Sequence, residues 1–342
     1  MPMIKPSTRA FFREASRKPG FPLREWLHGY IYARFIYAYL GNGLGERKPA
    51  RFYLWLRRQW RRVFGSPAPR PPKPGAVTFA DTYHGKVIPL ETARQLVSIR
   101  ENIQVAYPEQ VIPYKLARDL ILNQPEHIAV FDCPCRASRP NPCQPGDVCM
   151  VIGEPFASLV IEHHPHKSRW VNRAEALQII EDEHARGHVQ HAFFKEAMLG
   201  RFYAICNCCS CCCGAIQSQR NGSGMLASSG YLSRVDEEAC LGCGTCEDAC
   251  PFGALQLTDG TAQVDESLCL GCGVCLQACP QAALRLERRQ GSHLRQGVHG
   301  RGHDPHPSQR RQRRRRRAHV RGLAHVHVEP RQRRHDRDRQ GR

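Results

Sequence analysis

The spacing of apolar residues predicts both helices and strands in the first half of the chain. Apolar residues recur at helical intervals in residues 113–123, which predicts a helix there. The apolar run that follows at residues 127–131 predicts a short buried strand. Such a strand would deliver Cys133 and Cys135 together at its exit.

A helix-start signal and a second apolar stretch extend this pattern. Asn172, with Glu175 three residues later, resembles a capping box and predicts a helix that runs to about residue 186. A second helix is predicted over residues 189–199, and the Gly-, Ser- and Gln-rich residues 217–230 are expected to form a hinge. These elements predict an α+β fold.

Residues 21–64 combine aromatic residues with basic ones. Over residues 51–63, helical spacing puts apolar side chains on one face and most of the arginines on the other. The apolar face consists of Phe52, Trp55, Leu56, Trp60 and Val63. A basic amphipathic helix of this kind suits a membrane surface or an acidic partner helix. The alternative is that its aromatic face packs on the chain's own acidic centre.

The net charge of +19 over 342 residues is confined to the two ends. Residues 1–75 and 289–342 each carry +13, whereas residues 76–288 carry −7 and hold all 18 Cys. The C-terminal segment has 17 Arg and 8 His but no Lys, so we expect a disordered accessory tail or an out-of-frame translation. It lacks aromatic residues for base stacking, which argues against nucleic acid as the partner.

Composition therefore divides the chain into four expected regions. A basic helical segment ends in a Pro-rich linker and is followed by a Cys-rich α+β domain, a repeat domain and the Arg/His-rich tail. Their boundaries are residues 1–75, 76–229, 230–288 and 289–342.

Two absences in the sequence bear on location. No apolar run approaches the roughly 18 residues of a membrane span, and the first 20 residues lack the apolar core of a secretory signal. We therefore expect a cytoplasmic protein, with peripheral contact at the inner face of the membrane as an alternative. In that compartment Cys residues serve as metal ligands or redox groups rather than as disulfides.

An internal repeat holds eight of the Cys. Residues 235–257 and 264–286 are offset by 29 positions, and 15 of their 23 positions are identical. Each copy contains the motif C-x2-C-x2-C-x3-C-P, with a short predicted strand on either side and a short helix after the Cys loop.

The spacing of this motif indicates 4Fe–4S clusters. Three Cys at two-residue gaps wrap a loop around three corners of a cluster, and the fourth completes the cluster of the other repeat. The first expected ligand set is Cys240, Cys243, Cys246 and Cys279. The second is Cys269, Cys272, Cys275 and Cys250. A structural zinc site fits poorly, because it favours two separated Cys pairs around one ion.

Over about residues 230–288 both motifs resemble the bacterial-type dicluster ferredoxin family, with no ligand missing. The resemblance implies a βαββαβ fold with pseudo-twofold symmetry and the transport of single electrons between redox partner proteins. The potentials are expected to be on the order of −400 mV or below, lowered further by Glu247 and Asp248 near one cluster.

Ten further Cys lie upstream, in two loops. The Pro-rich stretch CPCRASRPNPCQPGDVC contains Cys133, Cys135, Cys143 and Cys149. The stretch CNCCSCCCG contains Cys206, Cys208, Cys209, Cys211, Cys212 and Cys213. Three interpretations are open: one or two further clusters, a zinc or other metal ion, or a dithiol/disulfide pair. The stretch CPCR, together with HAFFKEAMLGRFYAICNCCSCCCG, is similar to a group of ferredoxin-like proteins of anaerobic bacteria, which implies that this region belongs with the repeat domain.

Two groups of histidines are further candidates. His184, His188 and His191 are spaced i, i+4, i+7, so a continuous helix would place them on one face with Glu181. That face would suit a diiron or zinc site, or would be solvated. The irregularly spaced histidines expected at the surface are His163, His164 and His166.

The sequence shows no nucleophile–base arrangement, P-loop or dinucleotide-binding motif. The function expected is electron transfer by an iron–sulfur protein, as a carrier or subunit rather than a stand-alone enzyme. Two other classes are an oxidoreductase, in which the upstream Cys perform the chemistry, and a redox sensor that acts through the basic tail.

Overall fold

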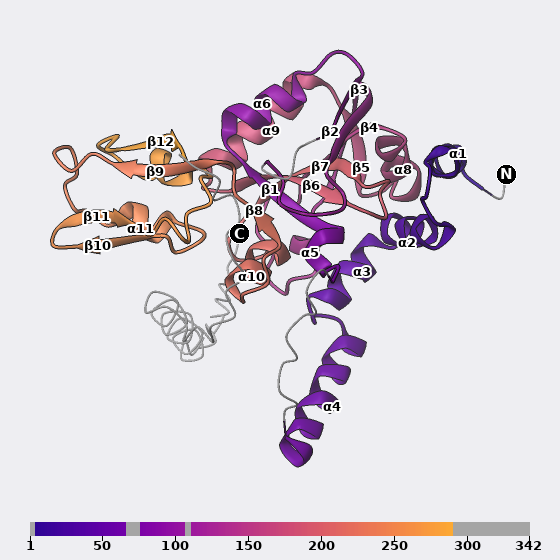
Figure 1. Ribbon diagram of the computed structural model, residues 1–342, viewed down its shortest axis with the longest axis horizontal. Coiled ribbons are helices and arrows are strands. Elements are labelled where there is room, and N and C mark those ends of the chain that lie inside the picture. The colour runs from indigo at the N-terminus through magenta and orange to yellow at the C-terminus, as the bar shows by residue number, and fades with distance from the viewer. Residues whose placement is uncertain (1–3, 66–75, 107–110, 290–342) are drawn as a thin grey trace, which may run out of the picture. The chain divides into compact units, whose positions relative to one another are not determined.

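The computed structural model describes residues 4–65, 76–106 and 111–289, and this part of the chain is α+β (Figure 1). The segment from residue 290 onward, for which disorder was expected, lies outside the described residues. Among the described helices, none is long and apolar enough to cross a membrane.

Four helices open the described chain, and the first three share a core with the Cys-rich region. They are α1 (Pro6–Arg17), α2 (Leu23–Arg34), α3 (Ile36–Gly43) and α4 (Lys48–Phe64). Phe11 of α1 packs edge-on against Phe156, with ring centroids 5.7 Å apart. On α2, the hydroxyl of Tyr32 lies 2.8 Å from that of Tyr203. Helices α1–α3 are thus part of the fold around the upstream Cys.

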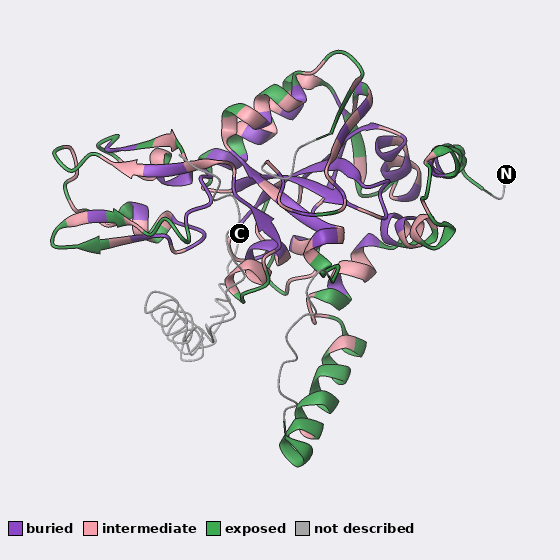
Figure 2. Cartoon of the chain, viewed as in Figure 1, coloured by how far each residue is buried: buried purple, intermediate pink, exposed green. Residues whose placement is uncertain are grey.

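Helix α4 differs from the other three, because none of its residues is buried (Figure 2). Its exposed apolar side chains include Phe52, Trp55, Leu56, Trp60 and Val63. The interpretation that this aromatic face packs on the chain's own acidic centre is therefore wrong for the described structure.

An eight-stranded sheet forms the centre of the Cys-rich region. Its strands are β1 (Tyr83–Ile88), β2 (Ile103–Ala106), β3 (Asp119–Asp132), β4 (Asp147–Glu154), β5 (Ser168–Val171), β6 (Val189–Lys195), β7 (Arg201–Cys208) and β8 (Leu226–Ala227). The order is β2-β3-β4-β7-β6-β1-β8, and β5 pairs with β3. Neighbours along this order are antiparallel except β1 and β8.

Helices cover both faces of this sheet. They are α5 (Phe79–Thr82), α6 (Leu90–Val97), α7 (Pro134–Ala137), α8 (Phe156–His163), α9 (Arg173–Ala185) and α10 (Gly214–Arg220). Successive strand residues point to opposite faces, so Phe194 packs in the core beneath α6 and α9, whereas Phe193 packs in the core that includes α1 and α8. Figure 1 shows α6 and α9 side by side on their face.

The helix predicted from Asn172 is confirmed. It is α9, and the Asn172 side chain accepts a hydrogen bond from the Glu175 N–H at 2.9 Å. The strand predicted at residues 127–131 is also confirmed as part of β3.

The two other predicted helices are wrong. Residues 119–123 already belong to β3, where burial alternates with period two, and residues 189–195 form β6. Every residue of β6 is buried between β1 and β7, so its sequence shows no strand alternation. The expected hinge at residues 217–230 instead contains most of α10 and all of β8.

The repeat region has the expected βαββαβ order. Its elements are β9 (Tyr231–Val235), α11 (Thr245–Ala249), β10 (Leu255–Thr258), β11 (Thr261–Val264), α12 (Val274–Ala278) and β12 (Leu284–Arg288). β9 pairs antiparallel with β12, and β10 with β11, so each sheet takes one strand from each repeat. Each helix starts after a glycine with left-handed backbone, Gly244 at φ 77° and Gly273 at φ 84°.

Candidate functional site

Two cavities in the repeat region each bring four Cys together. We call the first, of about 360 Å³ including its opening to solvent, the β10-side pocket; its cysteines are Cys240, Cys243, Cys246 and Cys279. The second, of about 330 Å³ including its opening, we call the β9-side pocket; its cysteines are Cys250, Cys269, Cys272 and Cys275. In each pocket three Cys come from the loop of one repeat and the fourth from the end of the other repeat's helix. These are the two sets that the spacing rule predicts.

Glycines allow the loops to curl around these pockets. Gly242 has φ 64°, and a Cβ there would lie 2.1 Å from the carbonyl oxygen of Gly260. Gly271 has φ 67°, and a Cβ there would lie 2.2 Å from the carbonyl oxygen of Tyr231. Any side chain would push the loop away from this neighbouring backbone and change the shape of the pocket.

The two pockets differ in burial. All four Cys of the β9-side pocket are buried, and burial raises the pKa of Cys275 to about 12. In the β10-side pocket Cys243 is exposed, and hydrogen bonds with Thr245 lower its pKa. Each pocket has a hydroxyl near one sulfur: Ser233 Oγ lies 3.3 Å from Cys275 Sγ, and Thr245 Oγ1 lies 3.4 Å from Cys243 Sγ.

A larger cavity, of about 1290 Å³ including its opening, lies in the upstream region. Four tyrosines line it, namely Tyr32, Tyr39, Tyr83 and Tyr203. Eight of the ten upstream cysteines line it as well, namely Cys133, Cys135, Cys149, Cys206, Cys208, Cys209, Cys212 and Cys213. We call it the upstream cavity.

Strand ends bring these Cys together. β3 ends just before Cys133, and Cys149 on β4 pairs directly with Cys206 on β7. Hydrogen bonds with Cys135 and Cys149, together with Arg136, lower the pKa of Cys133 well below its usual range. The same thiol contacts and burial raise the pKa of Cys135 and Cys149. So many neighbouring buried thiols cannot all lose their protons without a cation to balance the charge, but a metal centre could take the place of those protons.

Arg136 is the cation of this cavity, and sequence reasoning did not single it out. It lines the cavity, is only 1% exposed, and forms a buried ion pair with Glu183. Although burial opposes ionisation, hydrogen bonds from His188 and Arg136 lower the pKa of Glu183. A buried arginine beside many thiols favours anionic sulfur, and its position directly after Cys135 was the signal that could have found it.

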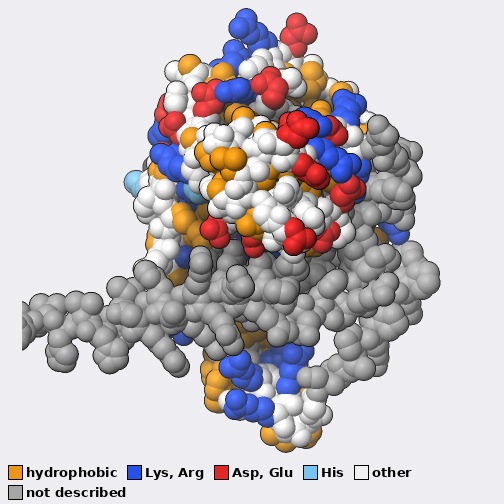
Figure 3. Space-filling view, turned by 90° about the vertical axis from the view of Figure 1, so that its left-hand side faces the viewer, with side chains coloured by type: hydrophobic (Ala, Val, Ile, Leu, Met, Phe, Trp, Pro, Cys, Tyr) orange, Lys and Arg blue, Asp and Glu red, His pale blue; other side chains and the backbone are white. Residues whose placement is uncertain are grey.

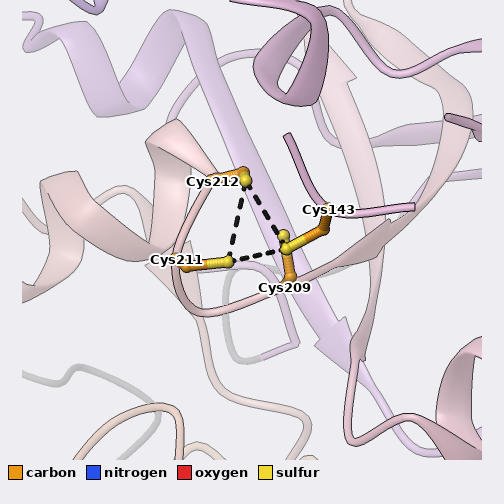
Figure 4. A group of neighbouring side chains, drawn as sticks. All are labelled: Cys143, Cys209, Cys211 and Cys212. Atoms are coloured by element: carbon orange, nitrogen blue, oxygen red, sulfur yellow. Dashed lines mark hydrogen bonds between the residues drawn. The ribbon is translucent and has the colours of Figure 1, made fainter. Parts of the chain in front are cut away.

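The remaining cysteines complete a second upstream group beside the cavity. The sulfurs of Cys143, Cys209, Cys211 and Cys212 all lie within 4.8 Å of one another (Figure 4). Cys209 and Cys212 also line the upstream cavity, whereas Cys143 and Cys211 do not. We call this group the Cys143 quartet.

Arg220 on α10 links the upstream cysteine loop to the repeat region. Its Nη1 donates to the carbonyl of Ser210 at 3.3 Å, and its Nε donates to the carbonyl of Pro251 at 2.7 Å. Pro251 follows Cys250 and lines the β9-side pocket. A second contact runs from the Ser229 N–H to the carbonyl of Leu270, 3.0 Å away, which lines the same pocket.

The histidines do not form the predicted helical face. α9 ends before His188, and His191 lies on β6, so the three do not share one helix. His184 contacts Gln190 and His188 contacts Glu183, while the His191 ring nitrogens have no hydrogen-bond partner among the described residues. The expected surface position is wrong for His163, which is buried and bonds to Thr8.

The surface of the repeat region combines apolar and acidic side chains. Figure 3 shows apolar side chains with both carboxylates and basic side chains around them on this face. Leu241, next to the β10-side pocket, is 72% exposed, and Leu257 and Leu268 are exposed as well.

Comparison with known proteins agrees with this geometry. Residues 239–283 match the 4Fe-4S dicluster domain family. A 37-residue stretch is 49% identical to an iron–sulfur subunit of the CoB–CoM heterodisulfide reductase of Methanopyrus kandleri. The match covers 11% of this chain and 6% of that protein, so the chain spans only a small part of its relative. No solved structure matches the chain. Residues 239–283 are therefore a 4Fe–4S dicluster domain, and this chain has an iron–sulfur redox role.

Proposed function

We propose that this chain transfers single low-potential electrons through two 4Fe–4S clusters. The first cluster would be held by Cys240, Cys243, Cys246 and Cys279, and the second by Cys250, Cys269, Cys272 and Cys275. The observation that carries the proposal is the exchange of the fourth Cys between repeats in the two pockets. When bound, such clusters supply one-electron redox chemistry.

The protein's own residues adapt each pocket to this role. Phe252 and Leu270 line the β9-side pocket and shield it from water. The β10-side pocket has an exposed Cys, which suits electron exchange with a docked protein. Glu247 and Asp248 on α11 add negative charge beside Cys246, and this lowers the potential of the first cluster.

Redox partner proteins would dock beside the β10-side pocket. The exposed Leu241 and the carboxylates on the face of the repeat region fit a partner that presents apolar and basic side chains. The relative from Methanopyrus kandleri is named as an iron–sulfur subunit of a reductase. By analogy, we propose that this chain serves as an electron-transfer component of a larger redox system, in the cytoplasm and in anaerobic metabolism.

The upstream cavity supports a third redox centre. Its six cysteines outside the Cys143 quartet could ligate a further cluster, and the contacts of Arg220 connect this region to the β9-side pocket. In this arrangement residues 76–229 and 230–288 act as consecutive parts of one electron path.

A second candidate function is an iron–sulfur oxidoreductase. The upstream cavity favours it, because its tyrosine and thiol lining could admit an apolar substrate. The dicluster domain would then deliver electrons to this cavity.

Anaerobic reconstitution followed by iron and sulfide analysis and EPR tests these proposals. About 8 irons per chain with two interacting cluster signals would support the dicluster carrier alone, and about 12 would add the upstream centre. A chain that binds no acid-labile sulfide would refute the main proposal. Turnover of a substrate that is lost in Cys133→Ser, with the dicluster signals retained, would favour the oxidoreductase.

Helix α4 offers a separate contact with an anionic partner. Its exposed aromatic face and its arginines suit an anionic lipid surface or an acidic helix. Sedimentation with vesicles that contain anionic lipid, compared with neutral vesicles, tests the lipid partner. The matched variant is Trp55→Ser/Trp60→Ser, which should abolish any vesicle binding.

A further inference from the structure

The Cys143 quartet is the tightest group of potential ligands in the described part of the chain. Its four sulfurs all lie within 4.8 Å of one another. Cys143 Sγ is 2.9 Å from Cys211 Sγ and 3.7 Å from Cys212 Sγ, and the sulfurs of Cys211 and Cys212 are 3.6 Å apart. Figure 4 shows the four side chains converging from two loops.

This spacing matches a single tetrahedral ion better than a cluster. A zinc ion bound to four thiolates at about 2.3 Å holds the sulfurs about 3.8 Å apart. In a 4Fe–4S cluster each thiolate binds a different iron, so iron and sulfide atoms separate the ligands more widely. Among the described residues, the eight repeat Cys form no group as compact as this quartet.

The backbone around the quartet is anchored by polar side chains. Arg139 donates from Nη2 to the carbonyl of Cys212 at 3.1 Å, and Gln217 donates from Nε2 to the carbonyl of Cys211 at 2.7 Å. Such outer contacts orient metal ligands before the ion binds.

Charge also favours an anionic metal–thiolate group here. Four thiolates around Zn²⁺ carry a net charge of −2, which needs cations nearby. Arg139 contacts the loop directly, and the buried Arg136 interacts electrostatically with Cys209. The Nε of Arg136 has no hydrogen-bond partner among the described residues, which leaves an N–H available to anionic sulfur in the cavity.

We propose that Cys143, Cys209, Cys211 and Cys212 bind one zinc ion, which is separate from the iron–sulfur clusters. Binding replaces the thiol protons, which are released to solvent, and involves no electron transfer. The ion joins the Pro-rich loop that carries Cys143 to the loop at residues 209–213. Because Cys209 and Cys212 also line the upstream cavity, the zinc site forms part of its wall.

Metal analysis and zinc K-edge X-ray absorption of the full chain, purified anaerobically, test this proposal. We expect one zinc per chain, surrounded by four sulfurs at about 2.3 Å. The variant Cys143→Ser/Cys211→Ser should lose the zinc and keep its iron and sulfide. The control Ser210→Ala lies in the same loop. It does not alter the backbone carbonyl that accepts a hydrogen bond from Arg220, so this variant should keep both the zinc and the iron and sulfide.

Three results would overturn the proposal. The first is wild-type protein with no zinc, or with zinc in an environment of nitrogen or oxygen ligands. The second is a loss of iron and sulfide together in the double variant, which would make the quartet cluster ligands. The third is a Cys143–Cys211 disulfide in the anaerobically purified chain. The absorption measurement on wild-type protein decides the issue even if the double variant does not fold. Failure of the zinc site would leave the dicluster proposal intact, because the latter depends on other residues.

Discussion

The two pockets of the dicluster domain share a motif but not an environment. Each has three Cys from one repeat and one from the other, and each loop turns at a glycine with positive φ. Yet every Cys of the β9-side pocket is buried, while Cys243 in the β10-side pocket is exposed. The shared positions build the ligand cradle, so the difference must come from positions where the repeats diverge.

The divergent positions explain the difference. Phe252 lines the β9-side pocket, whereas its repeat counterpart Gln281 lines the β10-side pocket. Glu247 on α11 corresponds to Leu276 on α12, which packs against the apolar core. The β9-side pocket also adjoins the upstream region through Arg220. One repeat motif can thus serve an inner redox site, in the β9-side pocket, and an outer one, in the β10-side pocket; the residues between the ligands and the contact with the upstream region together make the difference.

The largest effect should come from replacing the fourth Cys of each repeat with alanine. Cys250→Ala lies in the first repeat but should remove the cluster of the β9-side pocket, with a loss of about four irons per chain. Cys279→Ala should remove the other cluster instead. Iron analysis and EPR of both variants check this. If Cys250→Ala instead lost the cluster of the β10-side pocket, which contains Cys243, the exchange of the fourth Cys between repeats would be contradicted.

The next effect concerns the loop of the outer pocket. Gly242→Ala forces a Cβ against the Gly260 carbonyl, whereas at Gly244, also at positive φ, a Cβ would meet nothing within 4 Å. Alanine at either position should reduce the free energy of unfolding by about 1–2 kcal/mol because of its φ. Gly242→Ala should reduce it by about 1–3 kcal/mol more. Anaerobic thermal unfolding measures both, and equal losses would show that the exposed loop relaxes.

A smaller effect should follow from removing the link on the inner side. Arg220→Met removes hydrogen bonds to Pro251 and Ser210, and should lower the free energy of unfolding by about 1.5–3 kcal/mol. The control Arg285→Met removes an exposed cation and should change it by less than about 0.5 kcal/mol. If the two variants unfold alike, the contact between the two regions contributes little to stability.

The smallest effect should appear in the potentials. Ser233→Ala removes a buried hydroxyl beside the Cys275 sulfur. This hydroxyl stabilises the reduced cluster, which is more negative than the oxidised one. The potential of the inner cluster should therefore fall by about 20–65 mV, the one-electron equivalent of about 0.5–1.5 kcal/mol. Thr245→Val removes the matching contact at Cys243, where water can replace it, so the shift should be smaller. Protein-film voltammetry of both variants would show this order, and a larger shift in Thr245→Val would reverse the assignment of inner and outer sites.

Sequence reasoning succeeded where the signal was local. The repeat predicted the strand–helix–strand order and which Cys lie together in each pocket, because the spacing of the motif constrains a short loop and the helix after it. The Asn172 cap predicted α9 for the same reason, since a cap involves residues only three positions apart.

Sequence reasoning failed where burial hides periodicity. Strand β6 is buried along its whole length, so its apolar residues fit a helical pattern as well as a strand. The His184, His188 and His191 group failed with it, because its common face required a helix that ends at Ala185. The placement of α1–α3 in the core of the Cys-rich region was also missed, because it depends on contacts such as Tyr32 with Tyr203.

By itself, the sequence determined the α+β class, the dicluster repeat and the presence of ten more Cys upstream of it. Only the tertiary structure grouped those ten: eight line a tyrosine-lined cavity, and two of these, Cys209 and Cys212, converge with Cys143 and Cys211 in the Cys143 quartet. The reason is physical. A dicluster motif has its ligands within about ten residues, so spacing alone constrains their geometry, apart from the exchanged fourth Cys. Cys143 and Cys211 are 68 residues apart, and only the pairing of β3, β4 and β7 brings their loops together.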